Sequence, residues 1–200
     1  METPLERLRE GNRRFLAGAA RYHAPVSETE RRALAKGQAP FAAVLGCADS
    51  RVVPEILFDC KAGELFVVRV AGNVAGPLEI ASLEFAVESL GTRLVLVLGH
   101  TNCGAVASAF EARRTGAPPP SASLGVLLEK LEPALESASR AHARGDERAI
   151  LREAERRSAL ESAARLARES ALLERRLQED LRIASAIVDL ETGEVEFLAP

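Results

Sequence analysis

Three short apolar runs occur in the first half of the chain, and none of them alternates with polar residues. They cover residues 41–45, 65–70 and 94–98. Apolar runs of this length without polar alternation are typical of strands buried on both faces of a parallel sheet. Helical patterns lie between and after these runs, at residues 54–58, 78–90 and 105–114. The alternation of strands and helices predicts an α/β fold with a central, mainly parallel sheet flanked by helices.

Both ends of the chain predict further elements. An amphipathic pattern over residues 5–16 predicts an extended N-terminal helix that stops at Gly18, and a second short helix is expected over 28–35. Near the C-terminus, apolar residues 183–188 and 195–198 flank a Glu-Thr-Gly-Glu turn. This pattern predicts a strand, a tight turn and a C-terminal edge strand.

The segment 124–181 is rich in Ala, Leu, Glu and Arg, and it predicts several helices. Leu166, Ser170, Leu173 and Leu177 recur at helical spacing, so we expect this stripe to pack on the core or on a second subunit. No function is assigned to residues 124–168. We predict one domain, divided into an N-terminal helical arm (1–37), a site-bearing core (38–115), a helical region (121–181) and closing strands (182–200).

Composition narrows the class of protein. The chain has 200 residues, of which 47% are hydrophobic and 28% charged, as in globular domains. A net charge of −3 argues against a nucleic-acid partner. No run approaches the roughly 20 apolar residues that span a membrane, and the N-terminal pattern is not that of a secretory signal. We therefore expect a cytoplasmic protein without a membrane partner, in which the three cysteines stay reduced.

Reactive side chains follow two of the predicted strands directly. Cys47-x-Asp49-x-Arg51 comes after the first apolar run, and His100-x-x-Cys103 comes after the third. Open α/β sheets place their functional sites at the carboxyl ends of their strands. If the two strands are neighbours, Cys47, His100 and Cys103 converge there.

Two thiolates and one imidazole form a suitable donor set for zinc. A structural zinc site is the alternative, but such sites usually have two pairs of ligands, and this chain has only one pair at that spacing. Asp49 and Arg51 are suited to an ion pair in which the guanidinium holds the carboxylate through two hydrogen bonds. Without the cysteines beside it, that pair would be interpreted as purely structural.

The paired signature Cys47-x-Asp49-x-Arg51 and His100-x-x-Cys103 resembles that of the β-class carbonic anhydrases. Segments 62–73, 82–87 and 182–193 also resemble the family, and the likeness is strongest over 38–106. The resemblance implies zinc-dependent reversible hydration of carbon dioxide to bicarbonate and a proton, by attack of zinc-bound hydroxide. It implies one Zn²⁺ per chain and a homodimer or a dimer of dimers.

The resemblance also implies roles for individual residues. Cys47, His100 and Cys103 would be the zinc ligands. Asp49 would either accept a hydrogen bond from the zinc-bound water or, in a closed resting form, become the fourth ligand. Arg51 would hold Asp49 away from the metal.

A substrate pocket is implied as well. Gln38 matches a residue that donates to a substrate oxygen, Phe66 and Phe85 match pocket walls, and Gly104 matches a substrate-contacting backbone position. Phe85 replaces a frequent Tyr, so the hydroxyl contact of that Tyr is absent. Further departures that touch no ligand are Val70, Ser185 and Ile187.

Two alternative functions remain open on the sequence. The same zinc site could act on another small heterocumulene, such as carbon disulfide or carbonyl sulfide, or it could belong to a non-catalytic zinc-binding regulatory protein. Asp49, Arg51 and Gln38 argue against the regulatory alternative, since a structural metal does not need them. Cys60 is interpreted as a non-catalytic thiol. His23 and His142 are interpreted as surface residues, with proton transfer as the alternative.

Overall fold

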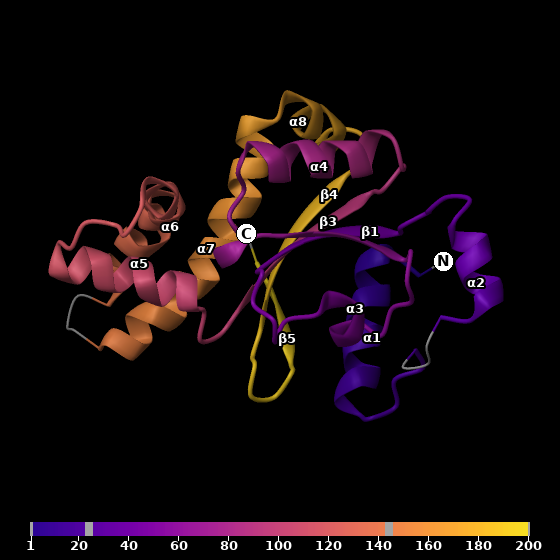
Figure 1. Ribbon diagram of the computed structural model, residues 1–200, viewed down its shortest axis with the longest axis horizontal. Helices are drawn as coiled ribbons and strands as arrows, with labels where there is room; N and C mark the ends of the chain where they lie inside the picture. The colour runs from indigo at the N-terminus through magenta and orange to yellow at the C-terminus, as the bar shows by residue number, and fades with distance from the viewer. Residues whose placement is uncertain (1, 23–25, 143–145, 200) are drawn as a thin grey trace.

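The computed structural model describes residues 2–22, 26–142 and 146–199. Within them, five strands form a sheet in the order β2-β1-β3-β4-β5 (Figure 1). The strands are β1 (Ala42–Gly46), β2 (Leu65–Arg69), β3 (Leu94–His100), β4 (Arg182–Val188) and β5 (Val195–Leu198). The first four strands run parallel to one another, and β5 runs antiparallel to β4. The predicted α/β fold with a C-terminal edge strand is confirmed.

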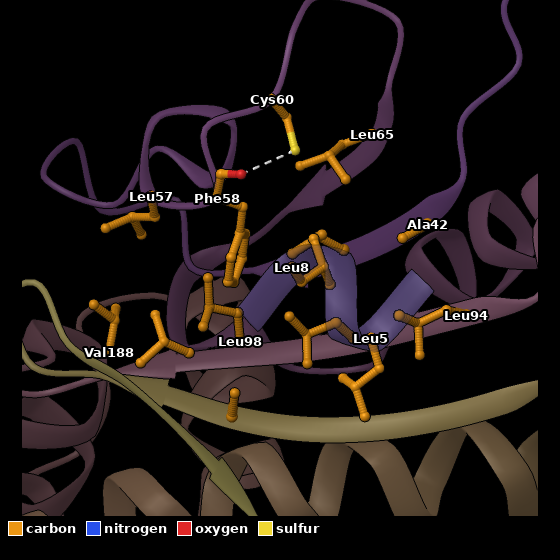
Figure 2. Packing of buried hydrophobic residues seen from close by; sticks show 14 of the residues in the cluster. Leu5, Leu8, Ala42, Leu57, Phe58, Cys60, Leu65, Leu94, Leu98 and Val188 are labelled. Carbon is orange, nitrogen blue, oxygen red and sulfur yellow. Dashed lines mark hydrogen bonds between the residues drawn. The ribbon is translucent and has the colours of Figure 1, made fainter. Parts of the chain in front are cut away.

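One face of the sheet is covered by α1 (Pro4–Leu16) and α3 (Pro54–Leu57), while α2 (Glu28–Leu34) has no buried residue. The helix α1 begins where Thr3 and Glu6 form a capping box. Its apolar stripe then places Leu8 against Phe58 in a fully buried cluster (Figure 2). Gly11 allows the close approach, because a Cβ there would lie 1.9 Å from the Phe58 carbonyl oxygen.

The opposite face is covered by α4 (Pro77–Glu88), α8 (Ala171–Leu177) and the C-terminal part of α7 (Glu147–Glu169). Leu166 and Leu173 are fully buried there, so the expected packing of this stripe on the core is confirmed. The stripe does not lie on one helix, however. Ser170 ends α7 and caps α8 by accepting a hydrogen bond from the Leu173 amide. Its side chain competes with the helical backbone for hydrogen bonds, and spacing alone does not reveal this.

A third group of helices packs beside the carboxyl ends of β1 and β3. It contains α5 (Gly104–Thr115), α6 (Ala122–Ala141) and the N-terminal part of α7, and the short turn η1 (Ala71–Asn73) lies against it (Figure 1). Leu131 and Leu135 of α6 are buried in this group together with Cys47 and Cys103. None of the described helices is long and apolar enough to cross a bilayer.

The strand β2 differs from the prediction of burial on both faces. Only Leu65 is buried in it, whereas β1 and β3 are buried along their whole length. The reason is its position at the edge of the sheet, where it has β1 as its one neighbouring strand in the described chain. An apolar run indicates a strand, but it does not distinguish an edge strand from a central one.

The strand order creates a switch point between β1 and β3. The chain leaves β1 for β2 on one side and then returns to add β3 on the other side. At such a point the connections diverge and leave a crevice at the carboxyl ends of the strands. Cys47 follows β1 there, and His100 is the last residue of β3.

Candidate metal centre

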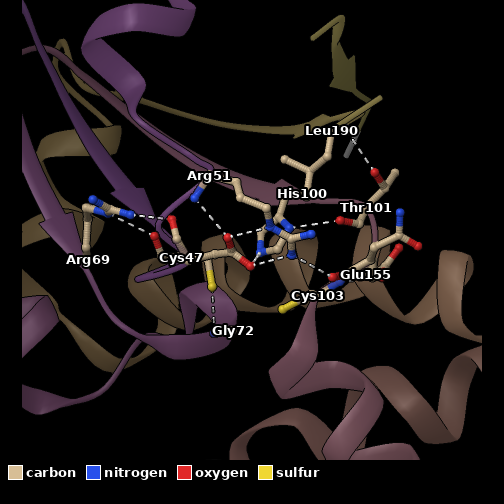
Figure 3. Close-up of polar contacts among 11 residues, drawn as sticks. Cys47, Arg51, Arg69, Gly72, His100, Thr101, Cys103, Glu155 and Leu190 are labelled. Atoms are coloured by element: carbon tan, nitrogen blue, oxygen red, sulfur yellow. Dashed lines mark hydrogen bonds and ion pairs between the residues drawn. The ribbon is translucent and has the colours of Figure 1, made fainter. Parts of the chain in front are cut away.

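Three donor atoms meet at the switch point. Ligand atoms of Cys47, His100 and Cys103 all lie within 4.8 Å of one another, and all three residues are buried (Figure 3). They come from two neighbouring strands, because Gly46 of β1 is paired with Leu98 of β3. The convergence expected from the sequence is confirmed.

The turn from His100 to Cys103 is short because Asn102 adopts a left-handed conformation, with φ 56°. Asn tolerates this region better than most residues, since its short polar side chain bonds locally. The turn ends at Cys103, which is the N-cap of α5. The strand end therefore presents His100, and the helix start presents Cys103, to the same space.

The imidazole of His100 is oriented for coordination. Its Nδ1 lies 2.9 Å from the Thr101 carbonyl oxygen, which can only accept, so Nδ1 carries the proton. The other ring nitrogen, Nε2, is buried and has no hydrogen-bond partner within the described part of the chain. A free lone pair in a buried position is what a metal ligand requires.

The two thiols differ in their acidity. Hydrogen bonds from Cys103 and from backbone amides that include Gly72 lower the pKa of Cys47. The Gly72 amide donates to Cys47 Sγ at 3.3 Å. Pairing with Cys47, followed by burial, raises the pKa of Cys103. The site thus favours one thiolate, the form of sulfur that binds metal.

These residues fit zinc. Two sulfurs and one imidazole nitrogen are the soft and intermediate donors that zinc prefers, and three protein ligands leave one position open. Each donor residue is buried, and His100 Nε2 has no hydrogen-bond partner among the described residues that would compete with the metal.

Asp49 and Arg51 stand beside the three donors. Arg51 donates from Nε to Asp49 Oδ1 at 2.9 Å and from a terminal nitrogen to Oδ2 at 2.7 Å. It also donates to the Asn102 carbonyl oxygen at 3.2 Å, which ties the two loops together. These hydrogen bonds hold the pKa of Asp49 well below its usual range. Asp49 Oδ2 lies 3.8 Å from His100 Nε2, so the ionised carboxylate faces the site.

Three residues that the sequence motifs did not single out support this centre. Arg69 donates to the carbonyl oxygens of Cys47 and Asp49, at 3.0 and 2.5 Å. The Thr101 hydroxyl accepts a hydrogen bond from the Leu190 amide and fixes the turn that follows β3. Glu155 of α7 accepts a hydrogen bond from the Cys103 amide. Arg69 lies within the segment that resembles the family, but Glu155 sits in a charged helix without any distinguishing pattern.

The expected pocket residues do not all meet at the metal centre of one chain. Gly104 does, since it follows Cys103 and a Cβ there would have open space around it. Phe66 is paired with Ala43, four residues before Cys47, which is about 13 Å away along the strand. Phe85 packs against Phe66 with ring centroids 6.2 Å apart. Gln38 is exposed in the segment before β1, at the opposite end of that strand from Cys47.

The remaining candidates lie away from the centre or outside the description. Cys60 is buried, donates to the Phe58 carbonyl oxygen, and has its pKa raised to about 12 by burial (Figure 2). A thiol with this pKa stays protonated at neutral pH, in agreement with the non-catalytic interpretation. His142 follows the C-terminal end of α6. His23 lies outside the described residues.

Comparison with known proteins gives consistent matches. The family model described as carbonic anhydrase matches residues 42–195. The chain is 40% identical over 187 residues to "Carbonic anhydrase 2" of Mycobacterium tuberculosis (strain CDC 1551 / Oshkosh), covering 93% of this chain and 87% of that protein. The β-carbonic anhydrase CafA of Aspergillus fumigatus is 28% identical, with a TM-score of 0.71 over 84% of this chain and 79% of that one. A tetrameric β-carbonic anhydrase of Sordaria macrospora shares the fold, at 23% identity, with a TM-score of 0.74 over 85% of this chain and 86% of that one.

Proposed function

The chain belongs to the β-class carbonic anhydrase family and catalyses the reversible hydration of carbon dioxide. From this premise we propose the role of each site residue in the reaction. The observation that carries the proposal is the convergence of Cys47, His100 and Cys103 beside the Asp49–Arg51 pair. We assign one Zn²⁺ per chain to the three converging donors. Zinc held there would act as a Lewis acid and make water a nucleophile near neutral pH.

Asp49 orients the attacking water. The carboxylate is ionised and can only accept hydrogen bonds, so it accepts a hydrogen bond from the water and turns the oxygen lone pair toward the substrate. Arg51 keeps this carboxylate in place, because its two side-chain hydrogen bonds occupy both carboxylate oxygens. The Gly104 backbone leaves room for carbon dioxide on the open side of the centre.

A second copy of the chain completes the substrate pocket. Within one chain, Gln38, Phe66 and Phe85 lie too far from Cys47 to contact a substrate there, as the register of β1 and β2 requires. Their surroundings are open to a partner: Phe85 is 50% exposed and Leu78, on the same helix, is 79% exposed. We assign the pocket to the boundary of a homodimer, in which Gln38 donates to the developing carboxylate oxygens of the substrate bound to the partner. A dimer of dimers is the larger assembly that we propose, and the Sordaria macrospora neighbour is tetrameric.

The proposal also places the protein in a reducing compartment such as the cytoplasm. Cys47 and Cys103 are buried free thiols, and the centre needs both as thiolates. Their sulfurs are close enough that oxidising conditions would favour a disulfide between them and remove both from the donor set. Cytoplasmic thiol buffers keep them reduced.

The role of Asp49 is tested by stopped-flow carbon dioxide hydration together with zinc quantified by elemental analysis. The parent should contain one zinc per chain and hydrate carbon dioxide rapidly. Asp49→Asn should keep the zinc and lose about 100-fold in kcat, because a misdirected nucleophile loses roughly that much. An Asp49→Asn enzyme as fast as the parent would refute the orienting role. A parent protein that contains zinc but does not hydrate carbon dioxide would support the non-catalytic alternative instead.

The pocket at the dimer boundary is tested by mixing two inactive variants. Cys103→Ala lacks a metal site but keeps Gln38, whereas Gln38→Ala keeps the metal site. If Gln38 serves the partner, a hybrid dimer contains one complete site, and hydration should rise above the sum of the two separate variants. Activity that stays at that sum in a verified hybrid dimer would place Gln38 in the site of its own chain or in neither.

A further inference from the structure

The helix α7 carries Glu155 to the metal centre, where Glu155 lies beside Cys103 (Figure 3). Its Glu155 is only 5% exposed, and Oε1 accepts a hydrogen bond of 2.9 Å from the backbone amide of Cys103. The sequence alone predicts no function for residues 124–168. This contact links the middle of that region to a zinc ligand.

The Cys103 amide needs such an acceptor. Cys103 is the N-cap of α5, and amides at the start of a helix have no partner inside the helix. The Cys103 side chain does not cap the helix either. The Glu155 carboxylate thus fixes the backbone direction from which the Cys103 sulfur projects.

Packing alone does not explain a carboxylate at this position. Glu155 Oε2 is buried and has no hydrogen-bond partner among residues 2–22, 26–142 and 146–199. The neighbouring Arg156 and Arg157 pair with Glu196 and Glu153 instead of with Glu155. Burying a half-satisfied carboxylate destabilises a fold, and an apolar side chain of similar size would not. Such departures from stable packing are expected where function requires them.

Two neighbouring contacts fix α7 against the ligand loops. Gly99 lets the helix approach β3, since a Cβ there would lie 3.3 Å from the Glu155 carbonyl oxygen. Ser158, one turn further along, donates to the Gly72 carbonyl oxygen at 3.1 Å, and the Gly72 amide donates to Cys47 Sγ. The helix therefore contacts the Cys103 turn directly and the Cys47 sulfur through Gly72, and Glu155 cannot withdraw without moving the helix.

We propose that Glu155 is a positioning residue, whose carboxylate oxygen holds the Cys103 turn so that the Cys103 sulfur and His100 Nε2 face the same cation as Cys47. The inference rests on the zinc assignment made above. Glu155 acts through its hydrogen bond to the Cys103 amide. Cys103 contacts the metal, and Glu155 does not.

The test compares three variants of the zinc-loaded enzyme. Glu155→Leu keeps the volume and removes the acceptor, Glu155→Gln keeps an acceptor oxygen, and Glu161→Gln repeats the same chemical change elsewhere on α7. Zinc loss to a chelator should be about 10–100-fold faster in Glu155→Leu, the range found when outer partners of metal ligands are removed. Glu155→Gln should restore the parent rate almost fully, and Glu161→Gln should match the parent.

Cobalt substitution supplies a readout independent of hydration. The sulfur-to-cobalt and ligand-field absorption bands should shift in Glu155→Leu and stay at the parent position in Glu155→Gln. Parent-like zinc loss and parent-like cobalt bands in a folded Glu155→Leu protein would overturn the proposal. A parent that binds no zinc would instead overturn the proposed function, so the two failures are distinguishable.

Amide hydrogen exchange in the zinc-loaded parent covers the case in which Glu155→Leu does not fold. The Cys103 amide should exchange slowly, because Glu155 is its acceptor. Exchange as fast as that of an unprotected amide would show that the bond is not formed, and the proposal would be wrong.

Discussion

The metal centre and the Asp59 latch are both buried polar sites, but they differ in how completely their atoms are paired. The Asp59 latch consists of Asp59 with Arg14, Arg21 and Tyr22. Asp59 Oδ2 accepts from Arg14 Nε at 2.6 Å, and Oδ1 accepts from the amides of Arg21 and Tyr22 at 2.7 and 3.0 Å. In the metal centre, by contrast, His100 Nε2 and Glu155 Oε2 have no partner in the portion of the chain that is described.

The difference separates a structural site from a functional one. A buried carboxylate whose oxygens are all satisfied contributes to the fold, and here it connects the chain after α1 to the turn after α3. A buried polar atom without a partner indicates a functional role, and for His100 Nε2 that role is to bind the metal. Changes at the latch should therefore alter stability, and changes at the centre should alter metal binding and rate.

The largest effect is expected from Cys103→Ala. The variant removes one of three donors, so zinc content and hydration should both fall by more than the 10–100-fold typical of outer partners. Elemental analysis and stopped-flow hydration measure the two quantities, and circular dichroism monitors the fold. Full zinc content in the variant would mean that the ligand set is assigned wrongly.

A smaller effect, of a different kind, is expected from Asp59→Ala. The substitution leaves Arg14 and two amides without their buried acceptor, and such a loss costs about 3–5 kcal/mol in the free energy of unfolding. Urea unfolding measures this change. The matched control is zinc content per folded chain, which should stay at the parent level; a loss of zinc would show that the latch and the centre are coupled.

The latch should also weaken in acid. Burial raises the pKa of Asp59, but the hydrogen bonds from Arg14 and the two amides outweigh it, so the pKa in the folded protein is below the usual value. A carboxylate with a depressed pKa stabilises the fold above its unfolded pKa of about 4, and the stabilisation is lost as pH falls through the folded pKa. The difference in unfolding free energy between the parent and Asp59→Asn should narrow below about pH 4. A constant difference there would contradict the role of the charge.

The smallest effect is expected from the exposed ion pair between Arg156 and Glu196. Its side chains are 37% and 58% exposed, although the pair is bidentate. Exposed pairs contribute about 0–1 kcal/mol because water and salt screen them. Arg156→Ala should shift the urea midpoint only slightly, and a shift as large as that of Asp59→Ala would show that pairing matters more than burial.

Much of the fold could be predicted because local signals agree with the tertiary structure. The apolar runs that became β1 and β3, the amphipathic pattern of α1 and the turn before β5 each indicate their own conformation. The helix break at Ser170 and the edge position of β2 could not be read in this way. Both depend on which residues lie beside them in the folded chain, and the local sequence pattern does not contain that information.

The sequence by itself determined the donor set, because Cys47, His100 and Cys103 follow strand-forming runs, and strand ends of a parallel sheet meet at one edge. Only the tertiary structure decided what surrounds those donors. It brought Glu155 from a helix 52 residues away to the Cys103 amide, and it separated Phe66 from the centre that its motif suggested. The physical reason is that local spacing fixes backbone conformation, whereas hydrogen bonds between distant residues form only after the whole core has packed.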